Sequence, residues 1–174
     1  MKNLHYILLF FLVLSCASIR VNYDYERATD FSKYKTYNYY SNINSGLSEL
    51  DTKRLLDALD SGLKAKGINL SDTPDFYVDI KSSEYQEVQN SSVGVGVGGT
   101  GGNVGGGISV GIPIGQSNFN RIIQFDFVDE NGLGLFWQAT SESSFSPNST
   151  PEQKETMFKA IVAKVLEGFP PINK

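Results

Sequence analysis

The stretch that decides the fold is "RIIQFDFVDENGLGLFWQATSESSF", residues 121–145. Residues 121–129 are predicted as a strand, because apolar and polar side chains alternate from Ile123 to Phe127, which is the period of a strand buried on one face. Asn131 and Gly132 follow, and this pair is the strongest short signal for a hairpin because both residues accept positive φ. Residues 133–145 therefore return as the antiparallel partner strand. The side chains expected in the core are Ile123, Phe125, Phe127, Leu135, Trp137 and Ala139.

A first helix is predicted before this hairpin, over residues 47–66. Ser48 followed by Asp51 can form a capping box at its start, and Gly67 is placed to end it. A start at Ser45 would move the boundary without moving the apolar face of the helix. That face consists of Leu50, Leu56, Leu59 and Leu63.

A second helix is predicted after the hairpin. Thr150 caps it, Pro151 takes the first helical position, and Gln153 completes a capping box. The proline pair at residues 170–171 ends the segment, because proline cannot continue a helix. The apolar stripe of this helix consists of Phe158, Ile161, Val162, Val165, Leu166 and Phe169.

Three further strands are predicted from their patterns, at residues 21–26, 34–40 and 76–88. Several consecutive strands thus separate the two helices, whereas a parallel α/β fold would alternate strand and helix one for one. The predicted fold class is therefore α+β: a two-layer sandwich in which a largely antiparallel sheet packs against two helices. Residues 21–174 form this single domain, and residues 89–118 are a Gly-rich insertion within it.

Residues 94–115 hold eleven of the seventeen glycines in the chain. Gly96, Gly98 and Gly101 match the dinucleotide-binding pattern G-x-G-x-x-G, but nothing helical follows them to receive the phosphates. The lysine that a P-loop needs directly after its last glycine is missing as well. We therefore expect no nucleotide here and no other cofactor in the chain.

The flanks of this Gly-rich segment alternate β-branched residues with small ones, which predicts a hairpin. The alternative is a mobile loop, because glycine loses the most backbone entropy on ordering. In either form the segment lies on the surface, and an exposed strand edge suits the recruitment of another strand. The residues predicted to bind a partner there are Val95, Val97, Ile108, Val110 and Ile112.

The N-terminus has the layout of a secretory leader. A positive charge precedes an apolar run at residues 6–14, which is too short to cross a bilayer because a spanning helix takes about 20 residues. The sequence "VLSC" ends at Cys16, the only cysteine, and resembles the lipobox of bacterial lipoproteins. We therefore predict a signal peptide at residues 1–15, a lipidated Cys16 and a short tether at residues 16–20. The alternative is a buried helix that ends in a free thiol.

Removal of this leader would leave a chain with few reactive groups, since the only histidine is His5 and the only cysteine carries the lipid. That excludes Ser-His hydrolases, Cys-His nucleophiles and zinc sites built from His and Cys. The net charge is −4 at pH 7, and neither sign forms a long run. This balance argues against nucleic acid and against anionic lipid as an electrostatic partner.

Several stretches together resemble a family of exported lipoproteins from Gram-negative bacteria that is known only as a domain of unknown function. They are "YDYERATDFSKYKTYNY", "LKAKG", "PDFYV", the Gly-rich middle, "VDENGLGLFW" and the closing "FPP". The chain departs from the family at Gln138 and Ala139, where a basic residue and glycine are usual. The resemblance implies an α+β lipoprotein that faces the periplasm and has no assigned catalytic residues. Ala17 is not aspartate, which by similarity to the usual sorting rule predicts the outer membrane.

Tyrosines are concentrated near the predicted anchor, where residues 23–40 contain six of the nine in the chain. They could form a platform that stacks on sugar rings of the cell wall. The simpler interpretation is that tyrosine is a good strand residue with an apolar body and a polar tip. Tyr37 and Tyr39 are the candidates for contact with a partner.

Four carboxylates are candidates for the acid and nucleophile of a glycosidase. They are Asp79, Glu84, Asp126 and Asp129, and their spacing singles out no pair. Asp79 and Asp126 are expected on the solvent faces of their strands, and Asp129 at a turn. A calcium site at residues 129–131 lacks the twelve-residue loop pattern, so no metal site is expected.

The predicted function is that of a lipid-anchored cell-envelope protein without enzymatic activity. Its partners are the membrane, through the lipid, and either an envelope protein or a cell-wall polymer. The alternative is a small carbohydrate-acting hydrolase that uses a carboxylate pair.

Overall fold

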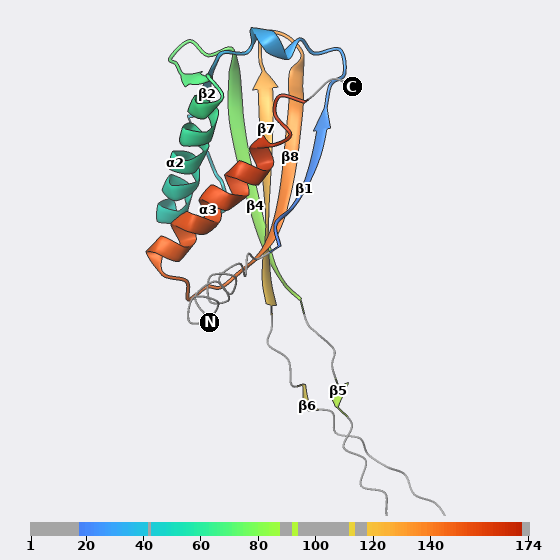
Figure 1. Cartoon of the computed structure of the whole chain (residues 1–174), viewed down its shortest axis with the longest axis vertical. Coiled ribbons are helices and arrows are strands. Elements are labelled where there is room, and N and C mark those ends of the chain that lie inside the picture. The colour runs from blue at the N-terminus through green and yellow to red at the C-terminus, as the bar shows by residue number, and fades with distance from the viewer. Residues whose placement is uncertain (1–17, 42, 88–91, 94–111, 114–117, 172–174) are drawn as a thin grey trace, which may run out of the picture.

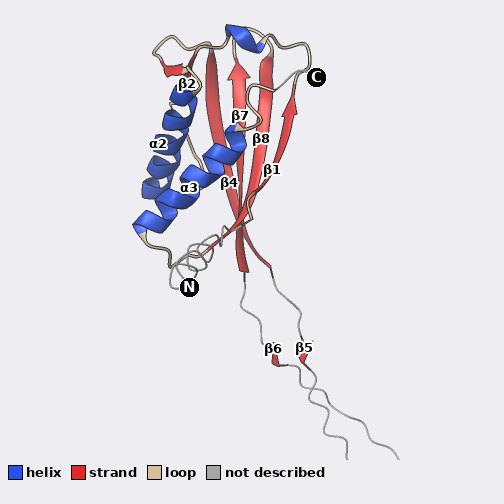
Figure 2. Cartoon of the chain, in the orientation of Figure 1, coloured by secondary structure: helices blue, strands red, loops and turns tan. Residues whose placement is uncertain are grey.

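The computed structural model describes residues 18–41, 43–87, 92–93, 112–113 and 118–171. Six strands form one sheet, and two helices lie on one of its faces (Figure 1, Figure 2). The strand order across the sheet is β1-β8-β7-β4-β2-β3. The predicted α+β sandwich is confirmed, because one face of the sheet packs against helices and its four largest strands are antiparallel neighbours.

The antiparallel strands are β1 (Arg20–Tyr25), β8 (Gly134–Phe145), β7 (Asn118–Asp129) and β4 (Phe76–Glu87). Two short strands, β2 (Thr36–Tyr39) and β3 (Asn69–Leu70), extend the sheet in parallel. Parallel neighbours need a crossover connection, and α2 (Glu49–Ala65) supplies it between β2 and the strands that follow. The pattern analysis found neither β3 nor this parallel pairing, since two residues are too few to show a period. A 3-10 turn, η2 (Phe31–Lys33), connects β1 to β2.

The start of α2 uses only half of the predicted capping box. The Ser48 side chain accepts a hydrogen bond from the Asp51 amide, as expected for an N-cap. The Asp51 carboxylate does not complete the box by accepting from the Ser48 amide, because Arg54 and Lys154 bind it instead. At the other end Gly67 has a φ of 79°, which only glycine adopts without strain, and the helix stops there as predicted.

The buried face of α2 differs from the predicted one. Leu59 and Leu63 are buried as expected, but Leu50 is 65% exposed and Leu55, which was not predicted, is fully buried. The reason is that α2 packs on the sheet and on α3 (Pro151–Leu166) at once. A Cβ on Gly62 would lie 2.6 Å from Leu166 Cδ1, so α2 turns its Gly62 side toward α3 and the buried arc lies away from Leu50.

The second helix, α3, follows its prediction closely. Thr150 and Gln153 form the complete capping box, and Pro151 takes the first helical position. The helix ends at Leu166, and Phe169 is buried beyond its end. The buried residues of the helix itself are Phe158, Ile161, Val162, Val165 and Leu166, which confirms the predicted stripe.

The hairpin of β7 and β8 contains a β-bulge that the sequence pattern did not reveal. Phe127 pairs with Trp137, but its neighbour Val128 pairs with Leu135, so Phe136 is the extra residue of β8. The prediction that Leu135 is a core residue is therefore wrong: Leu135 is 50% exposed, while Phe136 is 1% exposed. The bulge lets Phe136 and Trp137 both enter the core, where strict alternation would bury only one of them.

The turn of this hairpin also differs from the prediction. Among the described glycines of the turn, the residue with positive φ is Gly134, at 73°, and not Gly132. Asp129 organises the turn, since its side chain accepts a hydrogen bond from the Asn131 amide at 3.1 Å. The longer turn is consistent with the extra residue in β8.

Two short paired segments are described in the Gly-rich insertion. In β5 (Ser92–Val93) and β6 (Ile112–Pro113), Val93 lies opposite Ile112 in antiparallel register, as a hairpin requires. Val95, Val97, Ile108 and Val110 lie outside the described residues. So does Cys16, together with the rest of residues 1–17. In the described part of the chain, neither helix has the length and apolar composition needed to cross a membrane.

Candidate functional site

The face of the sheet that the helices leave uncovered carries a row of polar side chains across four strands. The strand registers place Asp24 opposite Gln138, Gln138 opposite Asp126, and Asp126 opposite Asp79. We call this set the open-face row. These residues occupy the positions between the core residues of their strands, so the pleat alone points them away from the helices.

Asp126 lies at the centre of the open-face row and is only 9% exposed. Gln138 Nε2 donates to its Oδ1 at 2.7 Å, and Gln124 Nε2 donates to its Oδ2 at 2.9 Å. Lys81 Nζ lies 2.8 Å from Asp79 Oδ2 and 3.8 Å from Asp126 Oδ2, so one cation bridges the two carboxylates. The row is therefore a set of hydrogen-bonding groups held in fixed positions.

Two stacked tyrosines lie beside the row. The rings of Tyr40 and Tyr77 are 5.0 Å apart and inclined by 24°. Burial, and then a hydrogen bond to the Glu130 carboxylate, raises the pKa of Tyr40 to about 12. Its hydroxyl is therefore protonated at neutral pH and acts as a donor, which adds an aromatic surface with a polar tip to the open face.

The four carboxylates proposed for a glycosidase fall in three separate places. Asp79 and Asp126 come together in the open-face row. Glu84 lies on the other face of β4, where Arg121 binds it with Nη2 at 2.7 Å and Nε at 3.0 Å. Asp129 lies at the hairpin turn. Only the first two are close enough to act together on one substrate.

The electrostatics of Asp129 do not suit a general acid. Tyr34 Oη donates to its Oδ2 at 2.9 Å, and Lys33 Nζ donates to the same oxygen at 3.0 Å. Burial alone would raise the pKa of Asp129, but these hydrogen bonds outweigh it and hold the pKa below the ordinary value. A general acid needs a raised pKa, so Asp129 does not suit that role.

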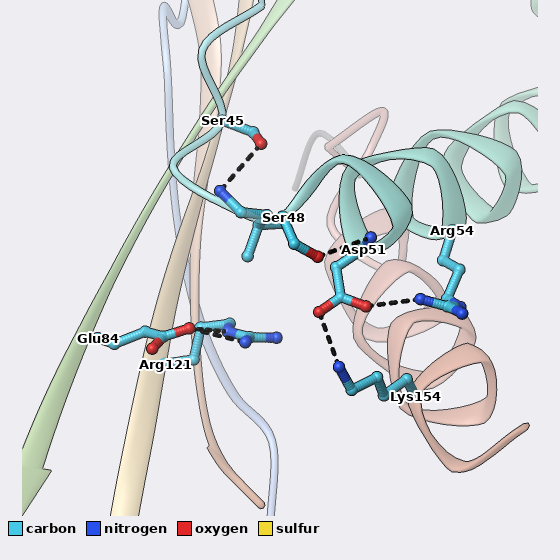
Figure 3. Close-up of polar contacts among 8 residues, drawn as sticks. Ser45, Ser48, Asp51, Arg54, Glu84, Arg121 and Lys154 are labelled. Atoms are coloured by element: carbon cyan, nitrogen blue, oxygen red, sulfur yellow. Dashed lines mark hydrogen bonds and ion pairs between the residues drawn. The ribbon is translucent and has the colours of Figure 1, made fainter. Parts of the chain in front are cut away.

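A second group of charged side chains joins the two helices (Figure 3). The buried Asp51 carboxylate accepts from Arg54 Nη1 at 2.8 Å and from Lys154 Nζ at 3.2 Å, which ties α2 to α3. Burial would raise the pKa of Asp51, yet the hydrogen bonds and charges of Lys154 and Arg54 lower it. Figure 3 also shows the Glu84–Arg121 pair, which comes from the neighbouring strands β4 and β7.

The two tyrosines predicted to contact a partner have different surroundings. Tyr37 is 1% exposed and packs on Phe76, so it belongs to the core and offers no surface. Tyr39 is half-buried. Both hydroxyls donate to Asp60 Oδ1, and burial followed by this bond raises the pKa of both groups. The role of Tyr37 is therefore corrected to packing, and Tyr39 keeps some surface for contact.

The residues that complete the open face were not singled out by the sequence. Gln124, Gln138 and Lys81 are ordinary polar residues at alternating strand positions. Gln124 precedes Asp126 by two residues in β7, whereas the cross-strand register brings Gln138 and Lys81 to it. The one available signal was the parity of their positions in each strand. Among the described residues, no group of three or more His, Cys, Asp or Glu side chains could hold a metal ion.

Comparison with known proteins places this geometry in a family. The family described as "Domain of unknown function (DUF4136)" matches residues 21–171. No curated protein matches the chain. The chain therefore belongs to the DUF4136 family, which agrees with the resemblance in that both are a domain of unknown function.

Solved structures share the fold at low sequence identity. The PelC dodecamer from Paraburkholderia phytofirmans aligns with a TM-score of 0.52 and 13% identity, over 90% of this chain and 100% of that one. A PDZ domain protein from Parabacteroides distasonis aligns with a TM-score of 0.53 and 13% identity, over 93% of this chain and 39% of that one. A DUF4136 family protein from Bacteroides thetaiotaomicron aligns with a TM-score of 0.47 and 14% identity, over 87% of this chain and 96% of that one.

Proposed function

We propose that this chain is a lipid-anchored protein of the bacterial cell envelope whose domain binds a partner and catalyses no reaction. Lipidation of Cys16 holds it to a membrane, and the domain faces the periplasm from the outer membrane. The partner is an envelope protein or a cell-wall polymer. Two acyl chains or more are enough for firm anchoring, because each buried methylene contributes about 0.8 kcal/mol.

The observation that carries the binding role is the open face. Packing against the helices uses only one face of the sheet, and the other presents the open-face row and the Tyr40–Tyr77 pair. Polar groups in fixed positions, beside an aromatic surface, suit recognition of a ligand rich in hydrogen-bonding groups. The aligned PelC structure is a dodecamer, so a further copy of this chain is included among the partners to be tested.

The anchor is tested by replacing Cys16 with serine in the full chain. The expected result is that the wild type sediments with the envelope fraction and Cys16→Ser moves to the aqueous fraction. Mass spectrometry of the wild type should show removal of residues 1–15 and a lipid on Cys16. A variant that still sediments, or a leader that is still attached, contradicts the proposal.

The binding surface is tested with a photo-crosslinking amino acid in intact envelopes. Introduced at Thr140 on the open face, it should capture one defined partner, and Gln138→Ala should reduce the capture. The matched control is the same amino acid at Lys159, an exposed position on α3. Equal capture from both positions would show that the open face is not the binding surface.

A second candidate function, hydrolysis of a glycan, rests on the closeness of Asp79 and Asp126. Cross-strand neighbours lie about 4.5–5.5 Å apart at Cβ, which is near the spacing of carboxylates in retaining glycosidases. We expect no cleavage of cell-wall glycan by the purified chain. Turnover that disappears in both Asp79→Asn and Asp126→Asn would establish the enzyme instead.

A further inference from the structure

A pocket of about 170 Å³ lies at the end of the domain opposite the β7–β8 turn. Phe145 of β8 forms one wall, Met157 and Phe158 of α3 form another, and the loop between these elements closes it. Its lining is mainly apolar, with Ser149 and Gln153 adding polar atoms at the rim. The open face lies on the other side of the sheet, so this pocket is separate from the open-face row.

Two cations line the pocket, and no carboxylate does. The Arg121 guanidinium lies 4.2 Å from the centre of the Phe145 ring, and its side chain is only 12% exposed. Lys154 Nζ is held by Asp51, which lies outside the lining. Glu84 binds Arg121 through Nε and Nη2, which leaves Nη1 as a donor for a ligand. The lining therefore combines two cationic donors, held in position by Glu84 and Asp51, with apolar walls.

This combination matches a ligand with an anionic group joined to an apolar part. A phosphodiester accepts hydrogen bonds from Arg and Lys, and the walls suit the carbon chain beside it. An apolar cavity of roughly 150 Å³ holds a group the size of benzene. The pocket therefore has room for a headgroup phosphate and its nearest carbons, but not for a whole lipid.

The pocket also lies at the end of the domain where the chain enters. The starts of β1 and α3 lie at the same end of the domain (Figure 1). Arg20, the first residue of β1, pairs with Glu142, three positions before Phe145. Cys16 precedes Arg20 by four residues, and an extended chain covers at most about 3.6 Å per residue, so the anchor lies within roughly 14 Å of the start of β1. A lipid on Cys16 therefore keeps this end of the sheet close to the bilayer surface.

We propose that the pocket binds the phosphodiester headgroup of an anionic phospholipid, such as phosphatidylglycerol, in the membrane that carries the anchor. This inference rests on the proposed lipidation of Cys16, which brings the pocket close to the bilayer surface. The net charge of −4 gives no long-range attraction to an anionic surface, so the anchor supplies proximity and the pocket supplies recognition. Binding orients the domain with the start of α3 at the bilayer and leaves the open face accessible to a partner.

The test uses the full lipidated chain in phosphatidylcholine vesicles that contain a trace of photoactivatable phosphatidylglycerol or, separately, photoactivatable phosphatidylcholine. Mass spectrometry then locates the labelled peptide. The phosphatidylglycerol probe should label residues 145–158. The phosphatidylcholine probe should not, because its choline cation would meet Arg121 and Lys154 and find no carboxylate in the lining. Labelling should fall roughly ten-fold in Lys154→Gln, which loses one charged contact, and in Ser149→Phe, which fills the pocket and keeps both cations.

Lys159→Gln is the matched control, because Lys159 lies on the same helix, pairs with Glu155 and does not line the pocket. It should be labelled like the wild type. Circular dichroism should show all three variants folded, and Asp51 keeps Arg54 as a partner when Lys154 is replaced. Equal labelling by both probes, or labelling that neither pocket variant reduces, overturns the proposal.

A second arm separates this proposal from the anchor. The full Cys16→Ser chain should bind short-chain phosphatidylglycerol in solution, with Lys154→Gln again roughly ten-fold weaker. Such binding supports the proposed pocket even if fractionation shows that Cys16 is not lipidated. If the variant does not bind this lipid, the proposed pocket is wrong even if Cys16 proves to be lipidated. Complete competition by an equal concentration of inorganic phosphate, or tighter binding of a peptide that ends in an apolar residue and a free carboxylate, also overturns the lipid assignment.

Discussion

The two faces of the sheet differ most clearly along β7, where alternate residues of one strand meet opposite surroundings. Ile123, Phe125 and Phe127 lie under the helices and are fully buried. Gln124 and Asp126 point the other way and form hydrogen bonds on the open face. The covered face thus supplies the packing free energy, and the open face contributes little to it. Polar residues on the open face can therefore be arranged for binding without weakening the core.

The bulge near the start of β8 is an exception to this separation of the two faces. There Phe136 and Trp137 are consecutive and both buried, so the alternation that separates the two faces breaks down. Phe136 stacks on Tyr34 with ring centres 4.0 Å apart, and Trp137 meets Phe127 at 4.6 Å. The gain in aromatic packing offsets the hydrogen bonds lost at the bulge.

The largest expected effect comes from the pair of neighbours at this bulge. Phe136→Ala removes a buried ring and should lower the free energy of unfolding by about 3–5 kcal/mol. Leu135→Ala, one residue away and half exposed, should change it by no more than about 0.5 kcal/mol. Urea denaturation followed by Trp137 fluorescence measures both. Equal losses would mean that the strand keeps its alternation and that the bulge is wrong.

The next largest effect is the difference in stability loss between removing a buried carboxylate charge and removing one on the open face. Asp51→Asn leaves Arg54 and Lys154 without their carboxylate and should cost about 1–3 kcal/mol at pH 7. Asp79→Asn removes a partly exposed pair with Lys81 and should cost no more than about 1 kcal/mol. A larger loss of stability in Asp79→Asn than in Asp51→Asn would show that the open face contributes substantially to the free energy of unfolding.

The Asp51 carboxylate also makes the free energy of unfolding depend on pH, in a direction that can be predicted. The pKa of Asp51 is lowered in the folded state, so its contribution is complete above the unfolded value, near pH 4, and is lost as the pH falls through the folded pKa. Wild type and Asp51→Asn should therefore differ at pH 7 and converge as the pH falls below the folded pKa of Asp51. Denaturation curves across this range measure the difference, and a constant gap would contradict the assignment.

The smallest expected effect lies in the turn that joins the two strands. Gly134 has a φ of 73°, and a Cβ there would meet nothing within 4 Å, so Gly134→Ala should cost only the backbone strain of about 1 kcal/mol. Leu133→Ala is the control in the same turn, because Leu133 is exposed and should change stability by no more than about 0.5 kcal/mol. A neutral Gly134→Ala would indicate that the turn adopts the Asn131-Gly132 form instead.

Local features were predictable because they depend on residues close together in the chain. The alternation in β7, the capping box at Thr150 and the stop at Gly67 were all correct, since each involves neighbours within four residues. The candidate site was predictable only in part. Asp79 and Asp126 were expected on the solvent side, and strand alternation places Lys81 and Gln124 on the same face, two residues away from them. Only the cross-strand register brings the two carboxylates and Gln138 together.

Features that depend on distant partners became clear only in the folded domain. Leu55 replaces Leu50 in the core because α3 packs against Gly62, and Asp51 is buried because Lys154, 103 positions away, reaches it. The pocket beside Arg121 likewise needs β7, β8 and α3 to meet. The amino-acid pattern specifies which face of each element is apolar, whereas only packing between elements decides how each one is rotated and which charges are enclosed. Rotation and enclosure depend on volumes and contacts that no local period encodes.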